Sequence, residues 1–185
     1  SKFLMIGLVR TLTGVRARWV GTEPSTRQRI YFANHTSNLD AVVIWASLPT
    51  LLRERTRPVA AHDYWTKGAV RRYLARNVFN VVLIERKNVT VKNNPLTPML
   101  AALDAGSSLI IFPEGGRMAG GGVGEFKSGI HHLATKRPEV ELVPVWIDNV
   151  NRVLPKGEFL PVPMLGSVTV GAPMTIAAGE LKETF

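Results

Sequence analysis

Short apolar runs rich in valine and isoleucine recur along this chain, and they restrict its fold more than any other feature of the sequence. The runs of strand length are residues 29–33, 58–61, 79–84, 108–112, 142–147 and 168–170. Stretches with helical character separate them, at residues 40–48, 65–76, 97–104 and 129–136. This alternation is typical of an α/β sheet, and runs that are apolar throughout indicate strands covered on both faces. We therefore expect a mixed, partly parallel central sheet flanked by helices.

The length of the chain limits it to one such unit. With 185 residues, of which 45% are hydrophobic, the chain can bury one core but is too short for two ordinary domains. We therefore predict a single domain over residues 21–185, preceded by an amphipathic helix over residues 1–20.

Residues 1–20 have the periodicity of such a helix. At about 100° per residue, one narrow stripe of a helical wheel carries Leu4, Leu8, Leu12, Val15 and Trp19. This stripe fits packing on the protein's own domain and insertion into a membrane interface equally well, while Arg16 and Arg18 favour the membrane. The apolar run at residues 3–9 is far shorter than the roughly 20 residues that span a bilayer, so we expect peripheral attachment.

The charge of the chain favours an anionic partner. Lys and Arg number 23 against 14 acidic residues, which gives a net charge of +9. Lipid headgroups, nucleic acid and phosphorylated small molecules all suit this excess, but no nucleic-acid-binding motif accompanies it. A nucleic-acid-binding module is therefore the alternative from another functional class. Because the chain contains no cysteine, a thiol nucleophile and a cysteine zinc site are excluded.

A basic cluster marks the predicted helix at residues 65–76. Arg71, Arg72 and Arg76 lie there together with Trp65 and Tyr73. Three alternatives fit this pattern: a solvated face, a surface that binds lipid headgroups, and a site for an acidic carrier protein.

His35 and Asp40 lie where the first long apolar run gives way to a helical pattern. In a continuous helix their side chains would stand about 140° apart, so contact between them requires a turn, which the intervening Thr-Ser-Asn favours. If they meet, Asp40 can hold one imidazole nitrogen while the other accepts a hydroxyl proton, as in a general base. The alternative is structural, because Ser37 and Asp40 also match a helix capping box.

A second motif, Phe-Pro-Glu-Gly-Gly-Arg, occupies residues 112–117 at the end of another strand-like run. Gly115 and Gly116 allow the backbone to approach an anion, and Arg117 offers a planar fork that suits two phosphate oxygens. Glu114 can anchor the loop or orient the base. The motif predicts a phosphate pocket, and its alternative is an ordinary turn with a solvated arginine.

Together the two motifs resemble those of the glycerolipid acyltransferase family, which includes lysophosphatidic acid acyltransferases. The resemblance covers about residues 25–150 and includes Val-Leu-Ile-Glu-Arg at 82–86, Phe-Lys-Ser-Gly at 126–129 and Val-Pro-Val at 143–145. It implies that His35 is the general base and Asp40 its orienting partner. The acceptor-phosphate site that it implies consists of Arg86, Glu114, Gly115, Gly116 and Arg117, with Lys127 adding positive charge. Gly116 departs from the family pattern, which usually has threonine there.

The resemblance implies transfer of a fatty acyl group from acyl-CoA or acyl-carrier protein to 1-acylglycerol 3-phosphate, which forms phosphatidate in phospholipid synthesis. Glycerol 3-phosphate or another lysolipid is the alternative acceptor. A catalytically silent lipid-binding relative is a further alternative, against which the presence of both His35 and Asp40 argues. We expect no cofactor, because the acyl thioester is a co-substrate, and no metal, because the histidines lack zinc-ligand spacing. The expected location is peripheral, on the cytoplasmic face of a membrane, with no nucleic-acid partner.

Overall fold

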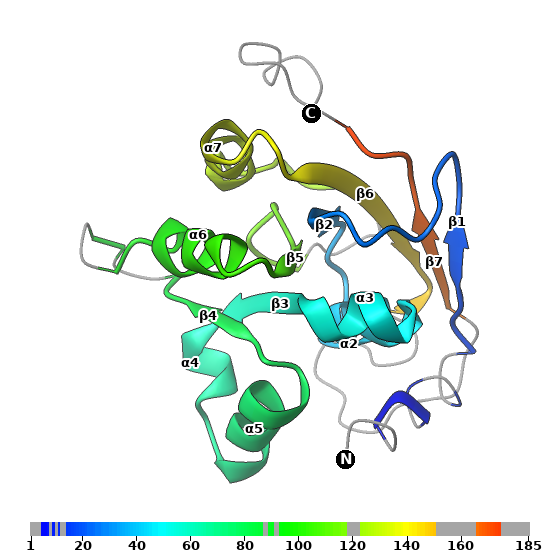
Figure 1. The fold of residues 1–185 in the computed structure, drawn as a ribbon. Helices are drawn as coiled ribbons and strands as arrows, with labels where there is room; N and C mark the ends of the chain where they lie inside the picture. Colours follow the sequence, from blue (N-terminus) through cyan, green and yellow to red (C-terminus); the bar gives the residue numbers. More distant parts are fainter. Residues whose placement is uncertain are drawn as a thin grey trace.

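The computed structural model describes residues 5–7, 9, 11, 14–86, 89–90, 93–117, 123–150 and 166–174, and these residues contain one seven-stranded sheet (Figure 1). The strands are β1 (Ala17–Trp19), β2 (Arg29–Ala33), β3 (Thr56–Ala61), β4 (Val82–Ile84), β5 (Ser108–Ile111), β6 (Glu141–Asp148) and β7 (Ser167–Val170). Their order across the sheet is β1-β7-β6-β2-β5-β3-β4. All neighbouring pairs are parallel except β6 and β7. The prediction of a mixed, partly parallel sheet flanked by helices is confirmed.

Helices cover both faces of this sheet. They are α2 (Asp40–Ser47), α3 (Thr50–Arg55), α4 (His62–Trp65), α5 (Ala69–Tyr73), α6 (Leu96–Asp104) and α7 (Gly129–Lys136), and a π-helical turn, η1 (Leu74–Val78), continues α5. The chain crosses from β2 to β3 in one direction along the sheet, and from β4 to β5 and β5 to β6 in the other. Because such crossovers are right-handed, α6 and α7 lie on the opposite side of the sheet from α2 and α3 (Figure 1).

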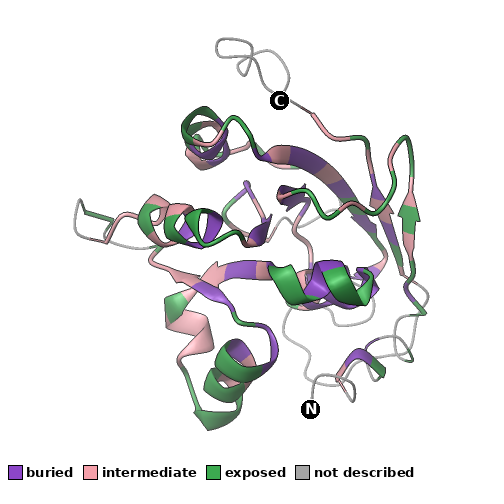
Figure 2. Cartoon of the chain, viewed as in Figure 1, coloured by how far each residue is buried: buried purple, intermediate pink, exposed green. Residues whose placement is uncertain are grey.

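The apolar character of the central strands is explained by the helices that cover both faces of the sheet. Every residue of β2 and β5 is buried (Figure 2). Because alternate side chains point to opposite faces, Ile30 and Phe32 join the core beneath α6 and α7, whereas Tyr31 and Ala33 join the core beneath α2. Two apolar layers on one sheet therefore explain why these runs show no polar alternation.

An ion-pair cluster ties β2 to β6 at the amino ends of the strands. Glu141 Oε2 accepts a hydrogen bond from Arg29 Nε at 2.8 Å, and Glu141 Oε1 lies 3.1 Å from Arg27 Nη1. Burial alone would raise the pKa of Glu141, but the hydrogen bonds and charges of Arg29 and Arg27 lower it overall. The carboxylate form is therefore favoured in the folded protein.

The segment before β2 differs from the expected helix. Residues 5–7, 9 and 11 are helical, but Ala17–Trp19 form β1, so the prediction of one helix over residues 1–20 is wrong at its carboxyl end. Leu4, Leu8 and Leu12 lie outside the described residues. Pairing of β1 with the open edge of β7 satisfies backbone hydrogen bonds that a periodicity pattern does not consider. No helix in the described part of the chain combines the length and hydropathy that crossing a bilayer requires.

Two other elements also depart from expectation. The predicted helix at residues 65–76 is divided, because Gly68 adopts a φ of 84° between α4 and α5. The strand expected at residues 79–84 begins only at Val82, since Asn80 has a φ of 49°, a conformation incompatible with extended backbone. The helix α3 was not predicted.

Candidate active site

The two sequence motifs meet because β2 and β5 are parallel neighbours. Phe32 of β2 pairs with Ile111 of β5, so the carboxyl ends of both strands open at the same edge of the sheet. His35 follows the first strand and Phe112 the second. The crevice outside the carboxyl ends of parallel strands is where open α/β sheets bind ligands.

Asn34 fixes the backbone at the point where β2 ends. Its side-chain amide donates to the carbonyl of Ile147 at 2.9 Å, and its carbonyl oxygen accepts from the Ile147 N–H at 2.8 Å. These bonds extend the pairing of β2 with β6 one residue beyond Ala33. Sequence analysis did not single out Asn34, although a polar residue closing a fully buried strand is a signal for such a role. His35 therefore begins its turn from a fixed point.

His35 and Asp40 are in direct contact. The turn at residues 36–39 brings His35 Nδ1 to 2.9 Å from Asp40 Oδ2. The same oxygen accepts the backbone N–H groups of Thr36 at 2.6 Å and Ser37 at 2.7 Å. A carboxylate is an acceptor only, so Nδ1 carries the hydrogen and Nε2 keeps the lone pair that a general base requires. The imidazole retains 22% exposure, whereas the Asp40 side chain is fully buried.

Besides contacting His35, Asp40 forms part of the helix capping box that was the alternative interpretation of this motif. Its bond to the Ser37 N–H is one half of a capping box, but the other half is not formed, because Ser37 Oγ accepts from the Leu39 N–H instead. The second carboxylate oxygen, Oδ1, is buried and has no hydrogen-bond partner among the described residues. A cap alone would not require a buried carboxylate that concentrates three donors on one oxygen. The geometry suits an orienting partner for His35.

Phe112 supports the imidazole from a second direction. Its ring is stacked on that of His35, with centroids 4.2 Å apart and planes inclined by 23°. The stacking restricts the rotation of His35 about its side-chain bonds and places a negative π-face against a ring that becomes positive on protonation. Sequence analysis gave Phe112 no such role, because the contact depends on the alignment of two strands.

The loop at residues 113–116 is a tight turn beside this ring. Gly115 has a φ of 71°, and its N–H donates to the carbonyl of Phe112 at 3.0 Å. A Cβ on Gly115 would lie 2.6 Å from Lys127 Nζ, so the lysine side chain packs directly against the glycine. The backbone N–H of Lys127 also donates to the carbonyl of Pro113 at 2.9 Å. The structure therefore brings Lys127 to the predicted phosphate loop.

Glu114 and Arg117 complete this loop with groups that the described residues leave unsatisfied. Glu114 is only 7% exposed, and neither carboxylate oxygen has a hydrogen-bond partner among the described residues. Arg117 is half-buried and forms no ion pair with that part of the chain. Gly116 has open space around its Cα. Arg117 is therefore available to a ligand, whereas the buried Glu114 carboxylate is not.

Arg86 is not brought into contact with the other predicted residues. It follows β4, three strands away from β2, which corresponds to a lateral distance of about 14 Å at the usual strand spacing. Its Nη2 lies 3.1 Å and 3.3 Å from the two carboxylate oxygens of Asp63. Arg86 therefore lies on the same edge of the sheet, at its far end.

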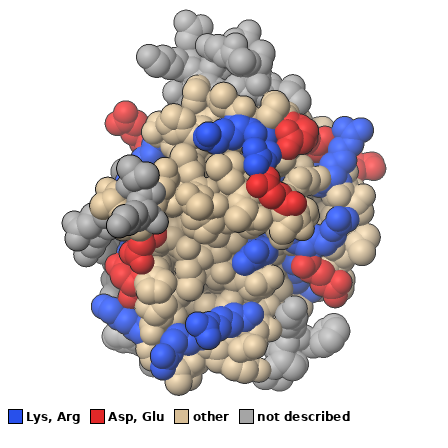
Figure 3. All heavy atoms as spheres, turned by 60° about the vertical axis from the view of Figure 1, so that its left-hand side comes forward, with Lys and Arg blue, Asp and Glu red and all other residues tan. Residues whose placement is uncertain are grey.

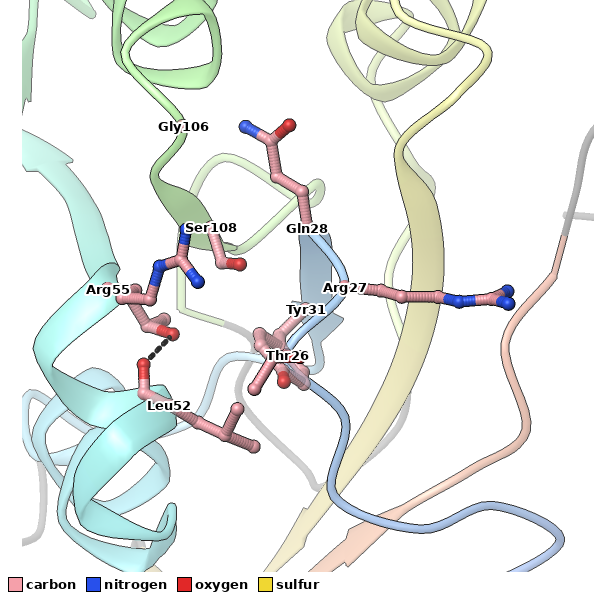
Figure 4. Close-up of a pocket in the computed structure, with 9 residues that line it drawn as sticks. Thr26, Arg27, Gln28, Tyr31, Leu52, Arg55, Gly106 and Ser108 are labelled. Atoms are coloured by element: carbon pink, nitrogen blue, oxygen red, sulfur yellow. Dashed lines mark hydrogen bonds between the residues drawn. The ribbon is translucent and has the colours of Figure 1, made fainter.

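A polar cavity of about 120 Å³ lies at the opposite edge, at the amino ends of β2, β3 and β5 (Figure 4). Two of its polar side chains, those of Gln28 and Thr56, are already bound to the protein's own backbone. The Gln28 amide donates to two carbonyl groups at 2.6 and 2.8 Å, and the Thr56 hydroxyl donates to the Leu52 carbonyl at 2.7 Å. These bonds tie strand ends together, and none of the lining residues belongs to the motifs. The carboxyl edge is therefore the candidate site.

Metal chemistry has no candidate ligand set in the part of the chain that the structure describes. No group of three or more His, Asp or Glu side chains is arranged there to hold an ion. The arrangement at the carboxyl edge can instead move a proton through His35 and hold an anion beside it.

Comparison with known families identifies the family of the chain. The profile of the Acyltransferase family matches residues 16–148, which include both motifs. The chain therefore belongs to the acyltransferase family.

Named relatives show which members of the family are similar. A 1-acyl-sn-glycerol-3-phosphate acyltransferase from Limnanthes alba is 27% identical over 165 residues, covering 85% of this chain and 55% of that protein. A probable 1-acyl-sn-glycerol-3-phosphate acyltransferase from Mycoplasma pneumoniae is 26% identical over 152 residues, covering 78% of this chain and 54% of that protein. The chain thus spans about half the length of these relatives.

A solved structure shares the fold. The crystal structure of the 1-acyl-sn-glycerophosphate (LPA) acyltransferase PlsC from Thermotoga maritima matches with a TM-score of 0.69 at 22% identity. The match covers 94% of this chain and 68% of that chain. At this identity the likeness shows a common architecture.

Proposed function

We propose that this protein transfers a fatty acyl group from an acyl thioester to a hydroxyl group of 1-acylglycerol 3-phosphate, forming phosphatidate. The observation that carries the proposal is the 2.9 Å contact between His35 and Asp40, one strand away from a loop whose Arg117 forms no ion pair with the described residues. The names of the relatives support the choice of acceptor. Glycerol 3-phosphate and other lysolipids are the alternative acceptors, and acyl-CoA and acyl-carrier protein are the two candidate donors.

In the proposed reaction, His35 Nε2 accepts the proton of the acceptor hydroxyl while that oxygen attacks the thioester carbonyl. Asp40 holds the Nδ1–H and stabilises the imidazolium that forms. When the tetrahedral intermediate collapses, the carbon–sulfur bond breaks and the imidazolium returns its proton to the leaving thiolate. The products are a new ester and a free thiol, and no covalent acyl-enzyme is required.

Arg117, Gly115 and Lys127 form the proposed phosphate-binding group, next to the buried Glu114, whose carboxylate has no hydrogen-bond partner among the described residues. Arg117 and the Lys127 ammonium supply positive charge, and the left-handed backbone at Gly115 lets the chain approach an anion closely. Gly116 extends the same turn. Arg86 would bind the same acceptor from the far end of the edge, which requires release or sharing of its contact with Asp63.

The proposed location is peripheral, on the cytoplasmic face of a membrane. The charge of +9 and the exposed basic residues support attraction to anionic lipid. The apolar side chains of Ile6, Val9 and Val15 pack in the domain's own core, so the proposed attraction rests on the exposed basic residues.

An acceptor panel tests the reaction. The purified protein is offered one acyl thioester with lysophosphatidate, glycerol 3-phosphate or a neutral lysolipid, and thiol release is followed. We expect lysophosphatidate to be used fastest, and His35→Ala to lower turnover by at least about 100-fold. His132→Ala, an exposed histidine on α7, is the matched control and should retain activity. Turnover that survives His35→Ala refutes the mechanism, and absent turnover with salt-sensitive DNA binding would favour a nucleic-acid-binding module.

Arg117→Ala tests the acceptor assignment. It should raise KM for lysophosphatidate far more than KM for the thioester, because a contact made in ground and transition states changes binding first. With an acceptor that lacks the phosphate, the variant should lose little further activity, since no interaction remains to be removed. Equal losses with both acceptors would make Arg117 a structural residue of the turn.

A further inference from the structure

The segment formed by α4, α5 and η1 presents an unusual surface at the catalytic edge of the sheet. α4 follows the carboxyl end of β3 directly, so this segment lies on the same edge as His35 (Figure 1). On α5, Val70 is 73% exposed and Tyr73 is 55% exposed. Residues three apart on a helix are neighbours, so these two apolar groups form one patch.

Exposed cations lie close to this apolar pair in the sequence. Lys67, Arg72 and Arg76 are exposed, and none of them forms an ion pair with the residues that the structure describes. Arg72 and Arg76 lie one residue before and three residues after Tyr73 and are exposed like it, whereas Ala75 and Val78 of η1 are buried. We call Lys67, Val70, Arg72, Tyr73 and Arg76 the α5 patch. Figure 3, with the side that carries α4 and α5 turned forward, shows basic side chains gathered on the lower part of this face.

The patch is attached firmly to the core. Phe79 packs edge-on against Trp45 of α2 and against Trp65 of α4, with ring centroids 5.1 and 6.0 Å apart. The Arg71 guanidinium lies 4.3 Å from the centroid of the Tyr64 ring, which joins α5 to α4. The exposure of the patch is therefore a property of a fixed surface.

We propose that the α5 patch is a docking surface for an anionic lipid bilayer. An exposed valine and tyrosine on a segment that also carries exposed cations match an interfacial helix, in which apolar groups enter the headgroup region and basic groups meet lipid phosphates. Water offers the two apolar side chains no stabilisation, and the cations have no acidic partner among the described residues. The apolar side chains and the cations therefore both favour an anionic bilayer. Docking there turns the edge that carries His35 towards the membrane. This orientation rests on the proposed function, whereas binding of vesicles does not.

Vesicle flotation tests the proposal with the whole chain. The probes are vesicles of neutral phosphatidylcholine and vesicles that also contain phosphatidylglycerol, and we expect binding chiefly to the second kind. Arg72→Glu/Arg76→Glu should weaken that binding by at least about 30-fold, since each basic residue near an anionic surface contributes about fivefold. Val70→Ser/Tyr73→Ser should weaken binding to the same vesicles without changing its salt dependence.

The matched control is Arg55→Glu/Lys136→Glu, which makes the same charge change at exposed residues near the amino ends of β3 and β6. Its affinity for the vesicles should stay within about threefold of that of the wild type if the position of the basic residues, and not the net charge of the protein, determines binding. Thiol release with a short-chain, monomeric acceptor should be the same in all variants. Wild-type vesicle binding without any thiol release would refute the proposed function and leave the docking surface standing.

Two results would overturn the proposal. One is equal vesicle binding by the wild type and the Arg72→Glu/Arg76→Glu variant. The other is that the Arg72→Glu/Arg76→Glu variant floats with vesicles as the wild type does but loses turnover selectively when acyl-carrier protein is the donor. That result would assign the α5 patch to an acidic protein partner.

Discussion

Replacement of Asp40 by asparagine removes one negative charge from the catalytic edge while preserving the shape of the side chain. The amide oxygen can still accept the bonds that Oδ2 receives from His35, Thr36 and Ser37. What is lost is the stabilisation of a positive imidazole. Two unit charges about 4 Å apart interact by about 4 kcal/mol at an effective dielectric constant of about 20. Asp40→Asn should therefore lower kcat by about 1000-fold.

The assay is thiol release from an acyl thioester, with kcat and KM measured separately and the fold checked by thermal unfolding. KM for both substrates should change little, because Asp40 is buried behind His35 and does not reach the crevice. Asp104→Asn is the matched control, since Asp104 is exposed and its ion pair with Arg137 lies at the end of α6. If Asp40→Asn keeps kcat within about threefold of the wild type, at unchanged stability, Asp40 acts only as a helix cap and the reasoning fails.

Three further perturbations test the supports of the site and of the sheet. Phe112→Ala should lower kcat by about tenfold, because loss of the stacked ring frees the His35 side chain, and Phe112→Leu should have an intermediate effect. Thiol release measures both rates, and equal kcat values in the two variants would contradict this role. Gly115→Ala should destabilise the fold by about 1 kcal/mol and raise KM for lysophosphatidate, because its φ is 71° and its added methyl meets a lysine, while Gly116→Ala should do neither. Glu141→Gln should lower the free energy of unfolding by about 2 kcal/mol at neutral pH. Because its two arginine partners lower the pKa of this glutamate, the wild-type advantage should be present above the usual glutamate range and disappear as the pH falls through the lowered value; denaturant titrations at several pH values measure it.

The sheet could be predicted because its signals are local. An apolar run such as residues 30–33 requires cover on both faces wherever it lies in the sheet, so composition alone predicts a buried strand. The short edge strand β1 could not be found in the same way. Ala17-Arg18-Trp19 carries too few residues to show a period of two, and its conformation is decided by the open edge of β7, far away in the sequence.

The candidate site likewise contains some contacts that are local in the sequence and others that depend on the order of the strands. The contact between His35 and Asp40 is a short-range consequence of the turn that separates β2 from α2, and residue types that favour turns predict it. The support from Phe112 and the clamp of Asn34 on Ile147 depend on which strands are neighbours and in which register. A single sequence contains no information on register until the sheet order is known.

Arg86 shows where motif reasoning needs the fold. Its place at the end of a strand-like run predicts a residue at the carboxyl edge, and the structure places it there, but next to Asp63 and not beside Arg117. The strand order puts β3 between β4 and β5, so the segment that follows β3 stands between the two arginines. A phosphate bound beside the 112–117 loop would lie next to the strand end that carries His35, whereas one bound by Arg86 would lie beyond β3. The two arginines are therefore separated along the edge by α4, which holds Arg86 through Asp63 and precedes the α5 patch in the chain.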